Sequence, residues 1–398
     1  MNILHINDKI ENGGGVETNI QQLCELGIGY GLKTHWIGVY ENNNKYHIKQ
    51  HPEKSELVNG VLSQIILCIQ EFCNTKKIDI IHVHSISNPK LLEALFKLRP
   101  VVRSMRDPRM FCPGQGKFWR NSERICDKTF GLHCVFHTYK EGCCNRHPKR
   151  LLKAYKNVLF ETTTANLNYS AIIVMSNYML DEAVKAGFDA DKIYLNPHLT
   201  PSVDSNELVL EQLGTKRSLL YVGRLSRTKG VHYMIDMGLT LLKKGFDIQI
   251  DIVGDGEDKE FFKSLIPVEF KESFIFHGWK SRGEVDKIMK ACYLLIFPSI
   301  YPEAFGISGI EAMMRGKPVV GFDVGGVSTW LKNDQSGYLV PVKDIDGLTE
   351  KTILLLNDQN LYKKMGKASR AIALREFSAV KHMSKLLEIY KNILNTKI

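Results

Sequence analysis

The sequence predicts an α/β protein with two domains, each built on an open parallel sheet that is covered by helices on both faces. At 398 residues the chain is longer than a single ordinary core supports. Its composition, with 44% hydrophobic and 24% charged residues, is typical of a soluble globular enzyme. In both halves, short apolar runs alternate with segments of helical periodicity, which is the pattern of parallel sheets with crossover helices.

Six apolar runs in the first half are predicted to be strands. They cover residues 3–6, 34–39, 78–83, 101–104, 171–175 and 193–195. Helices are predicted between them at residues 16–26, 61–72 and 178–186, where apolar residues recur with helical spacing.

The second half repeats the alternation after a polar stretch at residues 200–217, which we interpret as an interdomain linker. Its predicted strands cover residues 219–222, 248–253, 274–276, 294–297, 318–322 and 338–340. A last helix carries an apolar stripe formed by Met383, Leu386, Leu387, Tyr390 and Leu394. That stripe needs a surface to cover it, and either domain can provide one.

The N-terminal segment and the hydropathy predict a cytoplasmic protein. Asp8 interrupts the apolar core that a signal peptide would need. No run approaches the roughly 18 apolar residues of a membrane-spanning helix.

The positive charge is concentrated in one segment. The chain carries a net charge of +10, and residues 101–157 hold 13 Lys and Arg against four acids. Such a segment suits an anionic membrane surface, a phosphorylated acceptor or nucleic acid, and a merely solvated basic face is an equally good interpretation. Because the chain shows no nucleic-acid recognition module, we expect no nucleic-acid partner.

Five of the nine cysteines, Cys112, Cys126, Cys134, Cys143 and Cys144, lie within the same basic segment. A reducing cytosol argues against a disulfide framework. Cys112, Cys126, Cys134 and Cys143 can be interpreted as ligands of a structural zinc that would stabilise a long loop, although their spacing is not that of a standard zinc ribbon. Reduced thiols are the alternative.

The most informative segment runs from Phe297 to Met314. A strand ends at Phe297, a loop containing Pro298 and Pro302 follows, and a helix opens near Gly306. The free amides at that helix start can hold an anion such as a diphosphate. Glu311 falls on the apolar stripe of the helix, where a carboxylate needs a partner. It is either paired within the core or an acceptor for sugar hydroxyls.

Two further segments follow predicted strands. Residues 221–230 place a glycine and then two cations, Arg224 and Lys229, where they can neutralise a diphosphate leaving group. Residues 12–17 are glycine-rich but lack the G-x-G-x-x-G pattern, so a dinucleotide site is not supported.

Together these segments resemble the retaining glycosyltransferases of family four (glycosyl transferases group 1). The most specific feature is an E-x7-E motif, Glu303 to Glu311, within P-E-A-F-G-I-x3-E-A-M. The motifs at residues 253–256, 276–279, 316–326 and 337–341 fit the family as well. The resemblance covers nearly the whole chain. It implies the GT-B fold, with two facing Rossmann-like domains and a C-terminal helix that crosses back to the first domain.

The resemblance also implies domain boundaries and site residues. It predicts an acceptor domain at residues 1–199 plus 378–398, a linker at 200–217 and a donor domain at 218–377. Arg224 and Lys229 would bind the diphosphate, Glu311 the ribose, and Glu303 would lie near the transferred sugar as a catalytic residue. Donor contacts are also implied for a set of loop residues: Gly15, Gly254, Gly278, Trp279, Phe305, Gly306, Ile307 and Ser308.

One departure from the family concerns the segment Arg106-Asp107-Pro108-Arg109, where relatives commonly begin with His-Asp. We expect Arg106, Asp107 and Arg109 to influence sugar or acceptor specificity, with Arg106 meeting a carboxylate or another altered group.

The sequence therefore predicts a retaining transferase that uses a nucleotide diphosphate sugar, with UDP favoured, and needs no cofactor for catalysis. The acceptor would be a glycan, a lipid-linked sugar or a small molecule, in the synthesis of cell-envelope polysaccharide, lipopolysaccharide or glycolipid. Peripheral contact with the inner face of an anionic membrane is expected. A GT-B nucleotide-sugar epimerase and a non-catalytic donor-binding scaffold are the alternatives.

Overall fold

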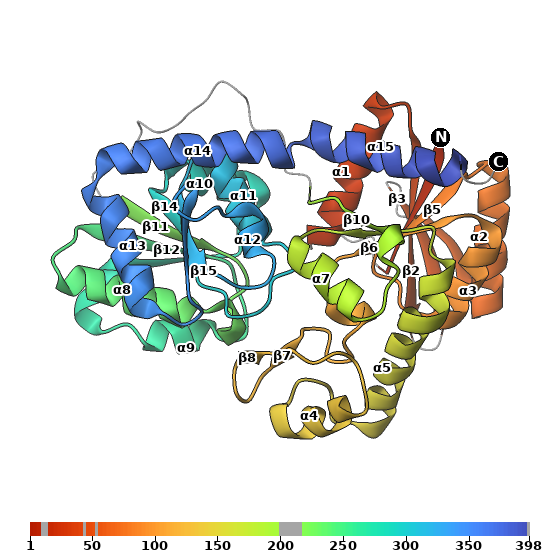
Figure 1. Ribbon diagram of the computed structural model, residues 1–398, viewed down its shortest axis with the longest axis horizontal. Helices are drawn as coiled ribbons and strands as arrows, with labels where there is room; N and C mark the ends of the chain where they lie inside the picture. Colours follow the sequence, from red (N-terminus) through yellow and green to blue (C-terminus); the bar gives the residue numbers. More distant parts are fainter. Residues whose placement is uncertain (9–14, 43–44, 52–54, 199–216, 396–398) are drawn as a thin grey trace. The chain divides into compact units, whose positions relative to one another are not determined.

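The computed structural model describes residues 1–8, 15–42, 45–51, 55–198 and 217–395 of the chain (Figure 1). The chain divides into two compact units. Unit 1 consists of Met1–Ser122, Cys126–Leu199 and Ala379–Ile398, and unit 2 of Glu123–Ile125 and Thr200–Ser378. Within the described ranges, none of the helices is both long and apolar enough to cross a membrane.

Unit 1 is built on an eight-stranded sheet with the order β10-β9-β6-β5-β1-β2-β3-β4. Its strands are β1 (Asn2–Asn7), β2 (Lys33–Asn42), β3 (Lys45–His51), β4 (Ser55–Gly60), β5 (Ile80–Val83), β6 (Val101–Met105), β9 (Ala171–Val174) and β10 (Ile193–Leu195). All six strands predicted in this half are present. The prediction of a wholly parallel sheet is wrong at one edge, because β3 pairs antiparallel with both β2 and β4.

Helices cover the sheet of unit 1. They are α1 (Gly15–Gly29), α2 (Leu62–Thr75), α3 (Pro89–Leu98), α5 (Pro148–Phe160), α7 (Asn177–Lys185) and the C-terminal α15 (Ala379–Asn395). The three helices predicted here correspond to α1, α2 and α7. Residues 12–14 of the glycine-rich segment lie outside the described residues, and Gly15 begins α1.

The predicted apolar stripe of the last helix is buried against unit 1. Met383, Leu386 and Tyr390 are at most 2% exposed, and they pack in one cluster with Ile3 of β1 and Val102 of β6. The prediction that the C-terminal helix returns to the first domain is therefore confirmed.

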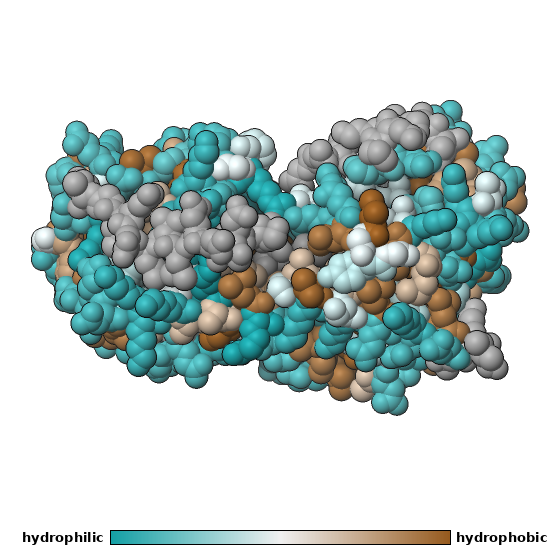
Figure 2. All heavy atoms as spheres, turned by 90° about the horizontal axis from the view of Figure 1, so that it is seen from above, coloured by the Kyte–Doolittle hydropathy of each residue, from teal (hydrophilic) through white to brown (hydrophobic). Residues whose placement is uncertain are grey.

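The view of Figure 2, turned so that the molecule is seen from above, shows mostly hydrophilic residues on the visible surface.

Unit 2 is built on a six-stranded, fully parallel sheet with the order β13-β12-β11-β14-β15-β16. Its strands are β11 (Arg217–Val222), β12 (Ile248–Val253), β13 (Phe274–Gly278), β14 (Leu294–Phe297), β15 (Val319–Phe322) and β16 (Gly337–Val340). Each matches a predicted strand. The predicted linker lies outside the described residues except for Arg217, which belongs to β11 instead.

The helices of unit 2 are α8 (Val231–Lys243), α9 (Lys259–Ser264), α10 (Arg282–Ala291), α11 (Ile307–Met314), α12 (Val327–Trp330), α13 (Ile345–Asn357) and α14 (Gln359–Phe377). Helix α14 buries Tyr362, Met365 and Phe377 in unit 2 and ends at Phe377, and α15 begins at Ala379 after the single residue Ser378. The cysteine-rich segment before α5 holds little regular structure, namely β7 (Phe118–Trp119), β8 (Arg124–Ile125) and α4 (His133–Glu141).

Candidate functional site

The strand order of unit 2 reverses between β11 and β14. Strands β11, β12 and β13 follow one another toward one edge, whereas β14, β15 and β16 run toward the other. Parallel sheets bind ligands outside the carboxyl ends of their strands at such a reversal, because the loops there diverge. The predicted donor segments, residues 223–230 and 298–306, are the loops that follow these two central strands.

The two central loops are joined by hydrogen bonds. The carbonyl oxygen of Thr228 accepts from the amides of Ile300 and Tyr301, each at 3.1 Å. Lys229 Nζ lies 2.5 Å from Glu303 Oε1, and Ser299 Oγ donates to the same carboxylate oxygen at 2.9 Å. The predicted diphosphate-binding lysine and the predicted catalytic acid are therefore ion-paired at the centre of the site.

Contacts with Trp330 of α12 and with Gly325 also hold the loop after β14. Trp330 of α12 donates its indole N–H to the carbonyl of Phe305 and packs edge-on against Phe297, with ring centroids 5.6 Å apart. Gly325 allows the backbone of residue 303 to approach, because a Cβ at Gly325 would lie 2.6 Å from the amide nitrogen of Glu303. Tight packing of this kind holds Glu303 in one position.

Helix α11 begins directly after Gly306, whose φ of +92° favours glycine. The amides of its first turn, at Ile307 and Ser308, have no partner within the helix and carry the positive end of its dipole. The structure therefore has a helix start at the predicted position, and its binding of an anion stays a prediction.

Glu311 lies on α11, and burial raises the pKa of its carboxyl group. The positive charges of Arg315 and Arg282 act against that increase. Arg315 itself is engaged by Asp286, to which its Nε donates at 2.8 Å. The candidate site therefore holds two acids eight residues apart, Glu303 paired with a lysine and Glu311 with a pKa that burial raises.

The remaining predicted donor residues follow β11, β12 and β13 along the same edge of the sheet. Arg224 is 71% exposed and pairs with Glu257 at 3.2 Å. The amide of Gly254 donates to the carbonyl of Gly278 at 2.9 Å, so these two loops lie together. Trp279 is 72% exposed. Sequence reasoning missed Glu257 as a partner of Arg224, because Glu257 does not belong to any of the motifs found in the sequence.

The predicted specificity residues lie in unit 1, where Arg106 is the centre of a buried polar cluster. Its guanidinium contacts Asn19 Oδ1 at 2.7 Å, His84 Nδ1 at 3.0 Å and His198 Nε2 at 3.0 Å. Burial lowers the pKa of Arg106 to about 10, and the charge of Glu17 opposes that decrease. Asp107 binds Arg109 through two hydrogen bonds from Nε, at 2.8 and 2.9 Å.

Three histidines extend this cluster, which we call the Arg106 network. His5, His82 and His84 have ring nitrogens within 4.8 Å of one another, as a metal site would require. Five of their six ring nitrogens lie within hydrogen-bonding distance of a partner: His5 Nδ1 meets His84 Nε2 at 3.1 Å, His84 Nδ1 meets Arg106, and His82 bonds Ser104 and Tyr390 at 2.8 and 2.6 Å. With a guanidinium beside them, we interpret these histidines as a hydrogen-bonded network. Sequence reasoning missed it because its members come from distant strands.

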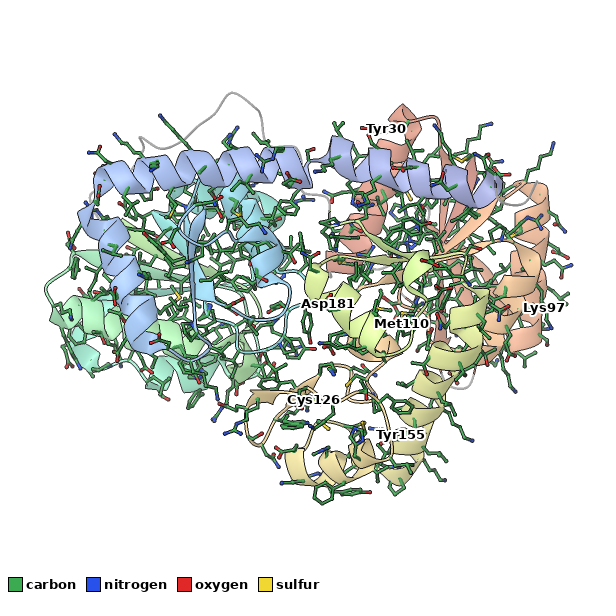
Figure 3. All side chains as sticks on the ribbon, in the orientation of Figure 1. Tyr30, Lys97, Met110, Cys126, Tyr155 and Asp181 are labelled. Atoms are coloured by element: carbon green, nitrogen blue, oxygen red, sulfur yellow. The ribbon has the colours of Figure 1, made fainter. Side chains whose placement is uncertain are left out.

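None of the five clustered cysteines forms a disulfide (Cys126 is labelled in Figure 3). Burial raises the pKa of Cys143 to about 11, and the neighbouring Cys112 and Cys126 add to the increase. Among the described residues, the His5, His82 and His84 set is the one group of potential ligands whose atoms converge within 4.8 Å. The zinc site at these cysteines remains a prediction.

Both units have central parallel strands and a strand-order reversal at which such sheets bind ligands, and the last helix returns to the first unit. These features define the GT-B fold of glycosyltransferases. The fold is similar to that of Anabaena HepE, solved in complex with UDP, with a TM-score of 0.67 and 17% identity over 98% of this chain and 100% of that chain. Residues 207–372 match the family model for glycosyl transferases group 1.

The chain is also similar to two named glycosyltransferases. The chain is 25% identical to the alpha-D-kanosaminyltransferase of Streptomyces kanamyceticus over 62% of this chain and 69% of that protein. It is 24% identical to the UDP-Gal:alpha-D-GlcNAc-diphosphoundecaprenol alpha-1,3-galactosyltransferase of Escherichia coli over 69% of this chain and 73% of that protein.

Proposed function

We propose that this glycosyltransferase transfers a sugar from a UDP-sugar with retention of anomeric configuration, and that it acts in the synthesis of cell-envelope polysaccharide or glycolipid. The observation that carries the proposal is the Lys229–Glu303 ion pair beside the start of α11, at the strand-order reversal of unit 2. UDP is favoured because the Escherichia coli relative uses UDP-Gal and the HepE structure contains UDP.

The proposed chemistry follows from the charges that the side chains and backbone amides of the site can stabilise. A departing diphosphate develops negative charge, which Lys229, Arg224 and the first amides of α11 are suited to stabilise. In the proposed step the bond from the anomeric carbon to the diphosphate oxygen breaks and a bond to the acceptor oxygen forms on the same face. The acceptor proton passes to the departing phosphate oxygen, so the balance needs neither a protein nucleophile nor a metal ion.

The ion pair suggests how substrate engages Glu303. Lys229 and Glu303 are 29% and 14% exposed, so their pairing is partly shielded from water. A donor diphosphate is a competing anion for Lys229, and its binding would release the Glu303 carboxylate for the hydroxyls of the transferred sugar. Glu311, whose raised pKa reflects its desolvation, is proposed to accept the ribose hydroxyls of the nucleotide.

We place the acceptor among lipid-linked sugars, glycans or small molecules at the cytoplasmic face of the membrane. The diphosphoundecaprenol acceptor of the Escherichia coli relative supports the lipid-linked choice. The basic segment supports peripheral membrane contact, because α4 and α5 expose apolar side chains, including Phe136 at 63% and Leu152 at 57%, among lysines.

The proposal predicts nucleotide-dependent stabilisation of the full chain. We expect UDP to raise the thermal midpoint more than GDP, ADP or TDP and to do so without magnesium. A ligand at 100 times its Kd contributes about 2.7 kcal/mol. Lys229→Ala should abolish most of the UDP shift, whereas Lys244→Ala, on an exposed lysine just after α8, should retain it.

Activity assays complete the test. Retention is checked by the anomeric coupling constant of the product in NMR spectra. A product of inverted configuration would exclude the proposed same-face step. Conversion of the UDP-sugar without acceptor would indicate an epimerase, and binding without any turnover would indicate a scaffold.

A further inference from the structure

Unit 1 contains an open pocket of about 990 Å³ that is independent of the donor loops of unit 2. Asp8 follows β1, Tyr40 and Glu41 end β2, and residues 85–91 connect β5 to α3. Strands β1 and β5 are neighbours, and the strand order of this sheet reverses between them. The pocket therefore occupies the place where a sheet of this type binds ligands.

One wall of the pocket is a basic face of α5. Lys149, Leu152, Lys153 and Lys156 line it at the i, i+3, i+4 and i+7 positions that share one side of a helix. All three lysines are exposed. No ion pair or hydrogen bond joins any of them to a described residue. The opposite side of α5 is anchored, because Leu151 and Val158 are buried.

The facing wall is aromatic and preformed. Tyr46 accepts a hydrogen bond from Asn88 Nδ2 at 3.0 Å, and Asn88 in turn caps α3 by accepting from the amide of Leu91. Tyr40 stacks on His47 with ring centroids 5.0 Å apart. Leu62 and Pro89 add apolar surface beside these rings. A pocket lined by fixed aromatic and apolar side chains and by exposed lysines is suited to a ligand with an anionic group and a less polar body.

We propose that this α5 pocket is the acceptor site and that the acceptor carries a phosphate or diphosphate, which Lys149, Lys153 and Lys156 bind. The inference rests on the proposed transfer function and deepens it by naming the chemical class of the acceptor. The three lysines are cations on one side of α5 that have no pairing partner among the described residues, and phosphate oxygens are suitable partners for them. The tyrosines and leucines are then left to contact the sugar or the lipid that bears the phosphate.

The test measures diphosphate binding to the full chain by calorimetry, in the presence of saturating UDP so that the donor loops are occupied. The probes are inorganic pyrophosphate and farnesyl diphosphate in phosphatidylcholine vesicles. We expect the Lys149→Gln/Lys153→Gln/Lys156→Gln variant to bind both at least about tenfold more weakly, because charge-assisted hydrogen bonds are lost.

A matched control removes the same charge elsewhere. Lys363, Lys364 and Lys367 are exposed on α14 of unit 2, and their triple Gln variant should bind the diphosphates as the native chain does. Both variants should keep the native thermal midpoint and the UDP shift. A native chain that shows no UDP shift would contradict the proposed function itself, and a retained UDP shift with unchanged diphosphate binding in the α5 variant would overturn the acceptor inference alone.

The two probes also identify the source of the phosphate. Binding of the vesicle-borne prenyl diphosphate more than about tenfold tighter than pyrophosphate supports a lipid-linked acceptor, and equal binding supports a water-soluble phosphorylated one. If the native chain binds phosphatidylglycerol vesicles but neither diphosphate, the lysines contact a membrane surface instead, and the acceptor inference is wrong.

Discussion

The Arg106 network holds several histidines uncharged inside unit 1. Burial lowers the pKa of His5 to about 3, and the charge of Arg106 adds to the decrease. The pKa of His382 is lowered to about 4, again mainly by burial. His82, His84 and His198 are lowered well below their ordinary values by burial, with Arg106 also contributing. Each histidine therefore accepts a proton far more readily in the unfolded chain.

This difference predicts that the protein loses stability in acid. Below the ordinary histidine value of 6.5 the unfolded chain binds protons that the folded chain excludes, so the free energy of unfolding falls as the pH decreases. Each histidine contributes a slope of about 1.4 kcal/mol per pH unit between 6.5 and its folded value. Glu161 and Glu311, whose pKa values are raised, act in the opposite direction but are fewer. Urea denaturation at pH 7.5, 6.5 and 5.5 checks this, and a constant stability would contradict it.

The cysteine cluster gives a second prediction at the same scale. Burial and neighbouring thiols raise the pKa of Cys126, Cys134 and Cys143, which keeps them protonated unless a cation is bound. A zinc ion reverses this preference, because it binds thiolates. We predict about one zinc per chain in protein purified without added metal, measured by elemental analysis.

Variants separate the predicted ligands from their neighbour. Cys126→Ser should lose the zinc, whereas Cys144→Ser should keep it, since Cys144 lies outside the predicted ligand set and its thiol already donates to the carbonyl of Pro113 at 3.2 Å. Protein that contains no zinc and exposes nine titratable thiols after denaturation would identify the cluster as reduced cysteines.

At the scale of elements, buried strands were predictable and the edge hairpin was not. Strands such as β14, Leu294–Phe297, are buried at every position, so they appear in the sequence as continuous apolar runs. Strand β3, Lys45–His51, buries Ile48 alone and lacks an apolar run. Helix α3 was not among the predicted helices, although the sequence does indicate where it starts. Asn88 caps it and Pro89 occupies its first turn.

The positions of the candidate donor residues in the fold were predictable for a related reason. Its residues lie within short loops after strands, so their order along the chain predicts that Lys229 and Glu303 meet once β11 and β14 are neighbours. The Arg106 network and the α5 pocket each combine side chains from at least four elements. No spacing within the sequence brings Tyr390 to His82, so these features needed the folded structure.

At the scale of the whole molecule, each unit has its own core, although the two consecutive helices at residues 359–395 serve one core each. Helix α14 completes unit 2, and α15 closes the core of unit 1, where Leu386 is 2% exposed. Leu355 of α13 is fully buried in unit 2. Because each unit has its own hydrophobic core, each is expected to unfold cooperatively by itself. We therefore predict two unfolding transitions in calorimetry of the full chain.

Two core substitutions assign these transitions. Leu386→Ala should destabilise unit 1 by about 2–5 kcal/mol, and Leu355→Ala should destabilise unit 2 by a similar amount, because each removes buried methyl groups and leaves a cavity. Each variant should lower one transition and leave the other within error. Ser384→Ala and Leu354→Ala, which alter more exposed positions one or two residues away, control for helix propensity and should change the free energy of unfolding of either unit by about 0.5 kcal/mol or less. A single transition lowered by both Leu386→Ala and Leu355→Ala would show instead that the two units unfold as one, in which case α14 and α15 transmit stability from one core to the other.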